Sequence, residues 1–195
     1  LDIMKKLLLL LLLVPMVSFG QTKEELQLCL AMQSSNFMSD SEAENALDKI
    51  LNTIGASTNF VLTPCSEINN AAATSYKGIR YILYDKEFMQ LINSRTNDWA
   101  SLAILAHEVG HHINGHSLDI LLMAADVVET KSLENKRKQE LQADEFAGFV
   151  LARLGATSDE ALAFTEVFQE KDDSYSTHPS KSKRVNAFYS MQSRG

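Results

Sequence analysis

The segment Trp99–Ile113 constrains the fold more than any other part of the chain. It reads WASLAILAHEVGHHI, so apolar residues fall at nearly every angle around a helix of this sequence. A helix that is apolar on all sides is buried in the protein interior. This one also carries His107, Glu108 and His111, and each buried polar group without a partner costs about 1–3 kcal/mol. The chain must therefore fold so that something in its interior pairs with these three side chains.

A metal ion fits these three side chains best. Residues i and i+4 of a helix lie about 40° apart, so His107 and His111 point the same way, one turn apart. Two imidazoles at this spacing can bind one Zn²⁺ ion, and the carboxylate of Glu108 can act as general base toward a water on that metal. The sequence therefore predicts one zinc ion per chain. The alternative is a helix that carries two histidines and a glutamate by chance.

Two carboxylates further along the chain are candidates for a third ligand. A catalytic zinc takes three protein ligands and keeps one position open. On the predicted helix Ser132–Leu154, Glu140 and Asp144 share the apolar face and should point inward. The two carboxylates repel each other unless a cation or hydrogen-bond donors compensate their charge. This requirement is met if one carboxylate binds a metal and the other accepts a hydrogen bond from a ligand histidine. An ordinary buried salt bridge with Lys136 or Arg137 is the alternative.

The remaining histidines of this region are predicted to face away from the site. On an ideal helix, His112 lies about 140° and His116 about 180° from His107. A metallochaperone that binds several metal ions through His107, His111, His112 and His116 is therefore an alternative with weaker support. It would also give the two inward carboxylates no role.

The N-terminal segment is typical of a secretory signal peptide. A basic start at Lys5 and Lys6 precedes the apolar run Leu7–Val14, which is too short to span a bilayer. We predict a signal peptide over residues 1–20 and a single catalytic domain over residues 21–195. An uncleaved membrane anchor is the alternative. No later run reaches the roughly 18 apolar residues of a spanning helix, so we expect no stable membrane insertion after cleavage.

Charge and cysteine content narrow the compartment and the partners. The formal net charge of −7 makes the chain a poor nucleic-acid binder. Cys29 and Cys65 are the only cysteines, and in an oxidising compartment they are predicted to form a disulfide. Two free buried thiols are the alternative. These features predict an exported protein, periplasmic or secreted.

Hydrophobic periodicity predicts a mainly helical α+β domain with a small sheet in its N-terminal half. Strands are expected over residues 59–63 and 78–84. Besides the segment around His107, which Asn97 or Asp98 should cap and Gly115 should end or bend, helices are expected over residues 24–33, 41–53, 88–92, 117–128, 132–154, 157–169 and 180–191.

The pair of motifs His107-Glu-Val-Gly-His111 and Glu140-Leu-Gln-Ala-Asp144 resembles the gluzincin metallopeptidases of the HtpX, BepA and CAAX-prenyl-protease group. The second motif of that group is Glu-x-x-Ala-Asp, which the chain matches in full. The resemblance implies a zincin-like metallopeptidase domain in which the HExxH motif lies on the active-site helix. It also implies that Glu140 is the third zinc ligand and that Asp144 holds a ligand histidine.

Two further segments resemble the same group. Thr177-His178-Pro179 followed by Arg184 is similar to its C-terminal Thr-His-Pro segment and following arginine. This implies that His178, with Arg184, stabilises the tetrahedral intermediate. Asn70-Ala71 resembles its edge segment, which pairs with the backbone of the substrate.

The motifs and the resemblance together predict a zinc-dependent endopeptidase. It would hydrolyse peptide bonds of unfolded or flexible proteins in the cell envelope by means of a metal-bound water, with Glu108 as general base. The polypeptide substrate would bind in extended form along the edge near Asn70. Gly110, unfavourable in a helix, is expected to allow close packing beside the metal. The alternatives are a catalytically inactive zinc-binding partner or chaperone-like module, and the metallochaperone.

Overall fold

The computed structural model describes Cys29 and residues 41–57, 59–66, 68–116, 132–168 and 170–192. The predicted signal peptide and the predicted helix over residues 117–128 lie outside this part of the chain, as does all but Cys29 of the helix predicted over residues 24–33. The described elements follow in the order α3 (Ser41–Thr53), β1 (Val61–Pro64), β2 (Ala71–Tyr76), β3 (Ile79–Tyr84), α4 (Lys86–Arg95), α5 (Trp99–Ile113), α7 (Ser132–Leu154), α8 (Ser158–Leu162), the 3₁₀ turn η3 (Ala163–Val167) and α9 (Lys181–Gln192).

The described strands form a three-stranded sheet in the order β1-β3-β2. β1 runs parallel to β3, and β2 runs antiparallel to it with Ala73 opposite Ile82. A tight turn at Lys77 and Gly78, both with positive φ, connects β2 to β3. A mainly helical α+β fold with a small sheet is therefore confirmed. Within the described sheet, β2 is an edge strand.

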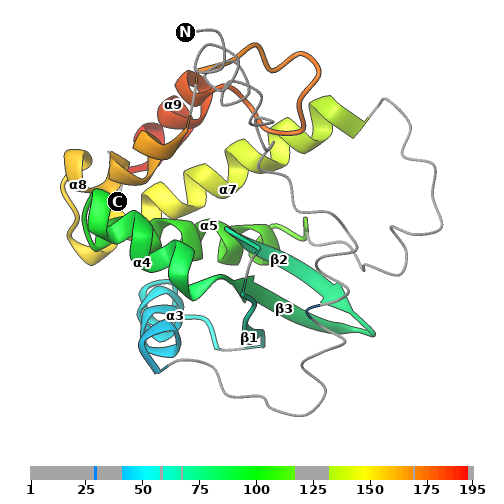
Figure 1. The fold of residues 1–195 in the computed structure, drawn as a ribbon, viewed down its shortest axis with the longest axis vertical. Coiled ribbons are helices and arrows are strands. Elements are labelled where there is room, and N and C mark those ends of the chain that lie inside the picture. The colour runs from blue at the N-terminus through cyan, green and yellow to red at the C-terminus, as the bar shows by residue number, and fades with distance from the viewer. Residues whose placement is uncertain are drawn as a thin grey trace, which may run out of the picture.

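Helix α5 crosses the middle of the molecule, with the sheet on one side and α7 on the other (Figure 1). α9 packs against α7. Most apolar residues of α5 are buried as its sequence predicts, among them Ala100, Ala103, Leu105, Ala106 and Val109, whereas Ile113 at its C-terminal end is exposed. The two helices that carry the motif residues are therefore next to each other in the core.

Small residues allow these helices to approach closely. A Cβ at Gly110 would lie 3.1 Å from the Cβ of Phe146 and 3.2 Å from the Cα of Ala143, which is tighter than ordinary packing, so glycine favours the close contact of α5 with α7. A Cβ at Gly148 would collide with the backbone carbonyl of Phe188, so α7 and α9 need glycine at theirs. The expected packing role of Gly110 matches this contact.

The C-terminal end of α5 corrects one prediction. Gly115 has φ +71°, and the His116 N–H donates to the carbonyl of His111 at 2.8 Å. The chain therefore reverses, and the ring of His116 lies 5.5 Å from that of His111. The predicted end or bend of the helix at Gly115 is confirmed, whereas the angle predicted for His116 was wrong because it extended an ideal helix past this glycine.

The segment after α7 corrects a second prediction. Thr157 and Glu160 form the predicted capping box, but the helix ends at Leu162 and continues as the 3₁₀ turn η3. This places the ring of Phe164 in the core, 5.0 Å from the ring of Phe188 on α9.

Within the described residues, no helix combines the length and apolarity needed to cross a membrane.

Candidate metal centre

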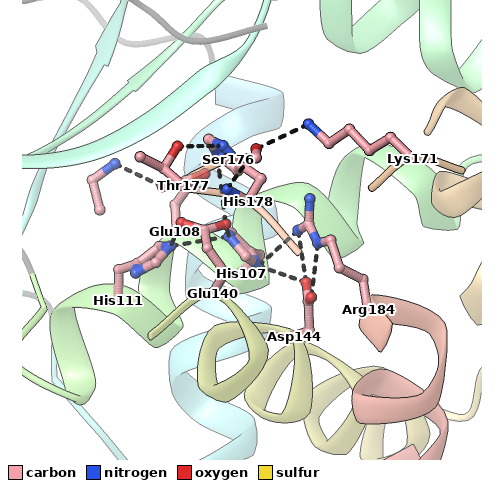
Figure 2. A network of polar contacts seen from close by, with 11 residues as sticks. His107, Glu108, His111, Glu140, Asp144, Lys171, Ser176, Thr177, His178 and Arg184 are labelled. Atoms are coloured by element: carbon pink, nitrogen blue, oxygen red, sulfur yellow. Dashed lines mark hydrogen bonds and ion pairs between the residues drawn. The ribbon is translucent and has the colours of Figure 1, made fainter. Parts of the chain in front are cut away.

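Three side chains from α5 and α7 bring ligand atoms together. The Nε2 atoms of His107 and His111 are 3.0 Å apart, and each lies 3.4 Å from a carboxylate oxygen of Glu140. In a tetrahedral zinc site with bonds of about 2.0–2.1 Å, ligand atoms are roughly 3.3 Å apart. These three residues can therefore hold a metal ion nearly as they stand, and Figure 2 shows their side chains pointing toward one another.

The composition of this set suits a catalytic zinc. Two imidazoles and one carboxylate occupy three of four tetrahedral positions and leave one open. The side chains of His107, His111 and Glu140 retain exposed fractions of 8%, 14% and 16%, respectively. The site is thus largely desolvated but reachable from outside.

Behind the ligands, Asp144 fixes the orientation of His107. Its Oδ1 lies 2.9 Å from Nδ1 of His107, and the carboxylate is fully buried. Such a bond sets the tautomer, because a proton on Nδ1 leaves the Nε2 lone pair for a metal. Inward placement of both Glu140 and Asp144 agrees with the periodicity of their helix.

Arg184 on α9 compensates the charge of Asp144. Its Nε and Nη2 donate to the two carboxylate oxygens at 2.8 and 2.7 Å. The guanidinium lies 4.2 Å from the ring centroid of Phe168 and is buried. Arg184 therefore takes the place of the salt bridge with Lys136 or Arg137 that the sequence left open. The contact with Phe168 had no sequence signal.

The charges of the site are strongly coupled. Burial alone would lower the pKa of His107, but the hydrogen bonds and charges of Asp144 and Glu140 raise it to about 10. Burial would raise the pKa of Glu140, but hydrogen bonds from His107 and His111 hold it well below its usual range. The pKa of Asp144 is likewise lowered, because the charge of Arg184 outweighs burial. Without metal, His107 is therefore protonated between two carboxylates.

Glu108 lies beside the ligands without belonging to them. Its side chain is buried, and Oε2 accepts a hydrogen bond from the backbone N–H of Ala73 at 2.7 Å. The carboxylate of the predicted base thus connects α5 to the edge strand β2. Sequence reasoning missed Ala73, because a backbone donor carries no residue-type signal.

His178 approaches the same site from the loop before α9. Its Nε2 lies 3.7 Å from Oε2 of Glu140, and its Nδ1 lies 3.0 Å from the hydroxyl of Thr177. Burial lowers the pKa of His178 against the opposing charge of Glu140. The ring is therefore neutral near pH 7, with Nε2 toward the metal ligands (Figure 2).

Arg137 on α7 holds the loop that carries His178. Its Nη1 donates to the carbonyl oxygens of Asp173 and Ser176 at 3.0 and 2.9 Å. The hydroxyl of Ser176 in turn accepts the backbone N–H of His178 at 3.1 Å. Arg137 was considered only as a salt-bridge partner, because nothing in the sequence connects it to carbonyls more than thirty residues away.

His112 is engaged elsewhere. Its Nε2 lies 2.9 Å from the carbonyl oxygen of Tyr81, and its ring stacks on Phe60 at 4.8 Å. It is therefore a buried link between α5 and the sheet, which weakens the metallochaperone alternative.

Asn70 and Ala71 lie at the start of β2, where the carbonyl of Asn70 accepts the N–H of Asp85 at 2.9 Å.

Comparison with a known protein family also supports a metallopeptidase site. Residues 118–192 match the family model described as Peptidase family M48. The matched region includes Glu140, Asp144, His178 and Arg184 but not α5, so His107, Glu108 and His111 are an independent observation. The match supports similarity to the zinc metallopeptidases of that family, without separating the HtpX, BepA and CAAX-prenyl-protease types. No curated protein matches the chain.

Proposed function

We propose that this chain is a zinc-dependent endopeptidase with a zincin-like catalytic domain. The observation that carries the proposal is the convergence of His107, His111 and Glu140 with Glu108 beside them. When bound, zinc would supply Lewis acidity, which lowers the pKa of a water in the open position toward about 7 and polarises a substrate carbonyl. The match to Peptidase family M48 supports a peptide bond as the target.

The protein's own groups would then handle the protons and the developing charge. Glu108 takes a proton from the attacking water and returns it to the leaving amine. If the Thr177 hydroxyl donates to Nδ1 of His178, the ring proton resides on Nε2. His178 then donates a hydrogen bond to the oxyanion that develops when the substrate carbonyl is attacked. A donor placed there stabilises the transition state more than the substrate.

Arg184 receives a different role from the one that the resemblance implied. Both of its hydrogen-bonded nitrogens are engaged with Asp144, which orients His107. We therefore assign Arg184 as a positioning residue that acts through Asp144. Oxyanion stabilisation remains with His178 alone.

An extended polypeptide is the proposed substrate. β2 is an edge strand of the described sheet, and an edge strand can bind a flexible chain through main-chain hydrogen bonds with little regard to its sequence. Cys29 and Cys65 form a disulfide with a Cα–Cα distance of 5.9 Å. Since disulfides persist in oxidising compartments, this supports an exported protein, periplasmic or secreted, and we propose a role in the cell envelope. The acidic net charge of −7 makes nucleic acid a poor partner, and we propose no stable membrane insertion after signal-peptide cleavage.

The test compares cleavage of denatured casein by the zinc-loaded chain and by its Glu108→Gln variant. We expect the variant to retain one zinc ion per chain by elemental analysis and to lose cleavage, because the base is gone and the ligands remain. Equal cleavage by both proteins would overturn the assignment of Glu108. Absence of cleavage by both, with zinc bound, would favour the inactive zinc-binding module.

A further inference from the structure

The hydrogen bond between Ala73 and Glu108 joins a backbone group to a candidate catalytic side chain. At 2.7 Å it is short, as charge-assisted hydrogen bonds are. Within the described residues, it is the one hydrogen bond that the Glu108 carboxylate makes. The buried position of Glu108 means that water does not readily replace this donor.

The direction of the Ala73 N–H follows from the pairing of β2 with β3. In an antiparallel pair, alternate residues turn their N–H and C=O groups toward the partner strand. Asn70 is turned toward β3, because its carbonyl accepts the N–H of Asp85. With Ala73 opposite Ile82 and Ser75 opposite Arg80, the N–H groups of Ala73 and Ser75 point away from β3. The edge of β2 that faces away from β3 in the described sheet therefore presents the Ala73 N–H where α5 presents Glu108.

We propose that the backbone N–H of Ala73 is a positioning group for Glu108, which holds Oε2 and leaves Oε1 to take the proton. This inference rests on the proposed peptidase function. A glutamate side chain has three rotatable bonds and loses appreciable entropy when it is ordered. A misplacement of about 1 Å in a reacting group can cost on the order of 100-fold in rate. The edge strand thus orients the base before a substrate arrives.

This arrangement also restricts how a substrate can pair with β2. An added strand would use the outward-facing N–H and C=O groups of the edge. At Ala73 the outward N–H is already bound to Glu108. The substrate carbonyl nearest to Ala73 is therefore not held by that N–H and is left for the chemistry beside Glu108.

Hydrogen exchange tests the contact without relying on activity. In the zinc-loaded full chain, we expect slow exchange of the Ala73 amide and fast exchange of the Ser75 amide, although both point to the same open edge. In the Glu108→Ala variant, exchange at Ala73 should accelerate at least tenfold while neighbouring paired amides of β2 stay protected. Equal rates at Ala73 in both proteins would overturn the contact.

Deleting the N–H alone tests its effect on rate. Replacing Ala73 with lactic acid in the full chain converts the amide to an ester and keeps the methyl group. We expect kcat on denatured casein to fall about 10- to 100-fold, with KM and zinc content unchanged. The matched replacement of Ser75 by its hydroxy-acid analogue deletes another outward-facing N–H of β2, so we expect it to raise KM through weaker pairing with the substrate while kcat changes by less than twofold. A similar fall in kcat at both positions would mean that the strand, and not this donor, is responsible.

A double-mutant cycle separates positioning from general damage. Glu108→Asp keeps a carboxylate but shortens its reach to Ala73. If Ala73 acts through Glu108, the ester should have little further effect in the Glu108→Asp variant, whereas independent effects would multiply. Multiplicative losses would overturn the inference while leaving a Glu108-dependent peptidase intact. Cleavage that does not depend on Glu108 would instead overturn the proposed role of Glu108 as general base.

Discussion

The site has two sides that are built differently. On the inner side, His107, Asp144 and Arg184 are buried between helices and joined by side-chain hydrogen bonds of 2.7–2.9 Å. On the outer side, His178 has a side chain that is 36% exposed, and the Glu108 carboxylate is held by a backbone group of an edge strand. The inner side should therefore govern folding and metal binding, and the outer side should govern rate.

Arg184→Leu should have the largest effect, and it should fall on stability. It leaves the fully buried Asp144 with only the His107 imidazolium, which Glu140 shares, and breaking one partner of a buried pair typically costs about 3–5 kcal/mol. Urea unfolding of the metal-free protein measures the change. Lys183→Leu is the matched control, because the Lys183 side chain is 56% exposed and Asp173 keeps the backbone N–H of Ser180 at 2.7 Å, so we expect a smaller loss of stability. Equal losses in both variants would break the distinction between the two sides.

His178→Ala should affect rate and leave stability unchanged. Removing one oxyanion donor typically lowers kcat by about 100- to 1,000-fold. Because His178 lies on a surface loop, the free energy of unfolding should change by less than about 0.5 kcal/mol. Steady-state cleavage of denatured casein, together with urea unfolding, measures both quantities. A loss of zinc from this variant would show that His178 belongs with the ligands.

Arg137→Gln should lower kcat in the same way as His178→Ala, but to a smaller extent. Without the two carbonyl contacts of Arg137, the loop loses its link to α7, and we expect kcat to fall about tenfold, less than full removal of the donor. Limited chymotrypsin cleavage after Tyr175, which is 93% exposed, should become faster. Lys138→Gln on the same helix is the control. Unchanged cleavage and kcat in Arg137→Gln would mean that the loop is held by other contacts.

The smallest effect concerns protons on the inner side. The pKa of His107 is raised from 6.5 to about 10 in the metal-free protein, so at pH 7.5 the residue is protonated and zinc must displace that proton. Calorimetric titration at pH 7.5 in buffers of different ionisation enthalpy should show about one proton released per zinc from His107.

The same shift makes the metal-free protein pH-dependent. Because the folded-state pKa lies above the unfolded value of 6.5, the stabilisation from His107 is full below pH 6.5 and is lost as pH rises toward 10. Urea midpoints between pH 6.5 and 10 should fall accordingly. In the calorimetric titration, a zinc-binding enthalpy that does not change with the buffer would contradict the protonated state of His107.

The placement of the side chains on the inner side could largely be predicted from the sequence. Helical periodicity places Glu140 and Asp144 on one face of α7, whose predicted bounds Ser132–Leu154 match the structure. The HExxH spacing places His107 and His111 together. These inferences depend on relations within one helix, where spacing determines direction.

On the outer side, the sequence identified Glu108 and, through the resemblance, His178, but it did not identify the groups that hold them, because these contacts join distant segments. The bond from Ala73 to Glu108 spans 35 residues and uses a backbone donor. The contact of Arg137 with Asp173 spans 36 and uses a backbone acceptor. His116 was misplaced because one glycine turned the chain. Local periodicity does not predict such tertiary contacts.

Zinc titration of the wild-type chain and its Glu140→Ala variant is the most direct test of the metal centre. Glu145→Ala, on the same helix but outside the ligand set, is the control. We predict one zinc ion per wild-type chain, an affinity for zinc at least 100-fold lower in Glu140→Ala, and wild-type affinity in Glu145→Ala. Several weakly bound ions, with affinities unaffected by Glu140→Ala, would contradict a zinc centre built from His107, His111 and Glu140.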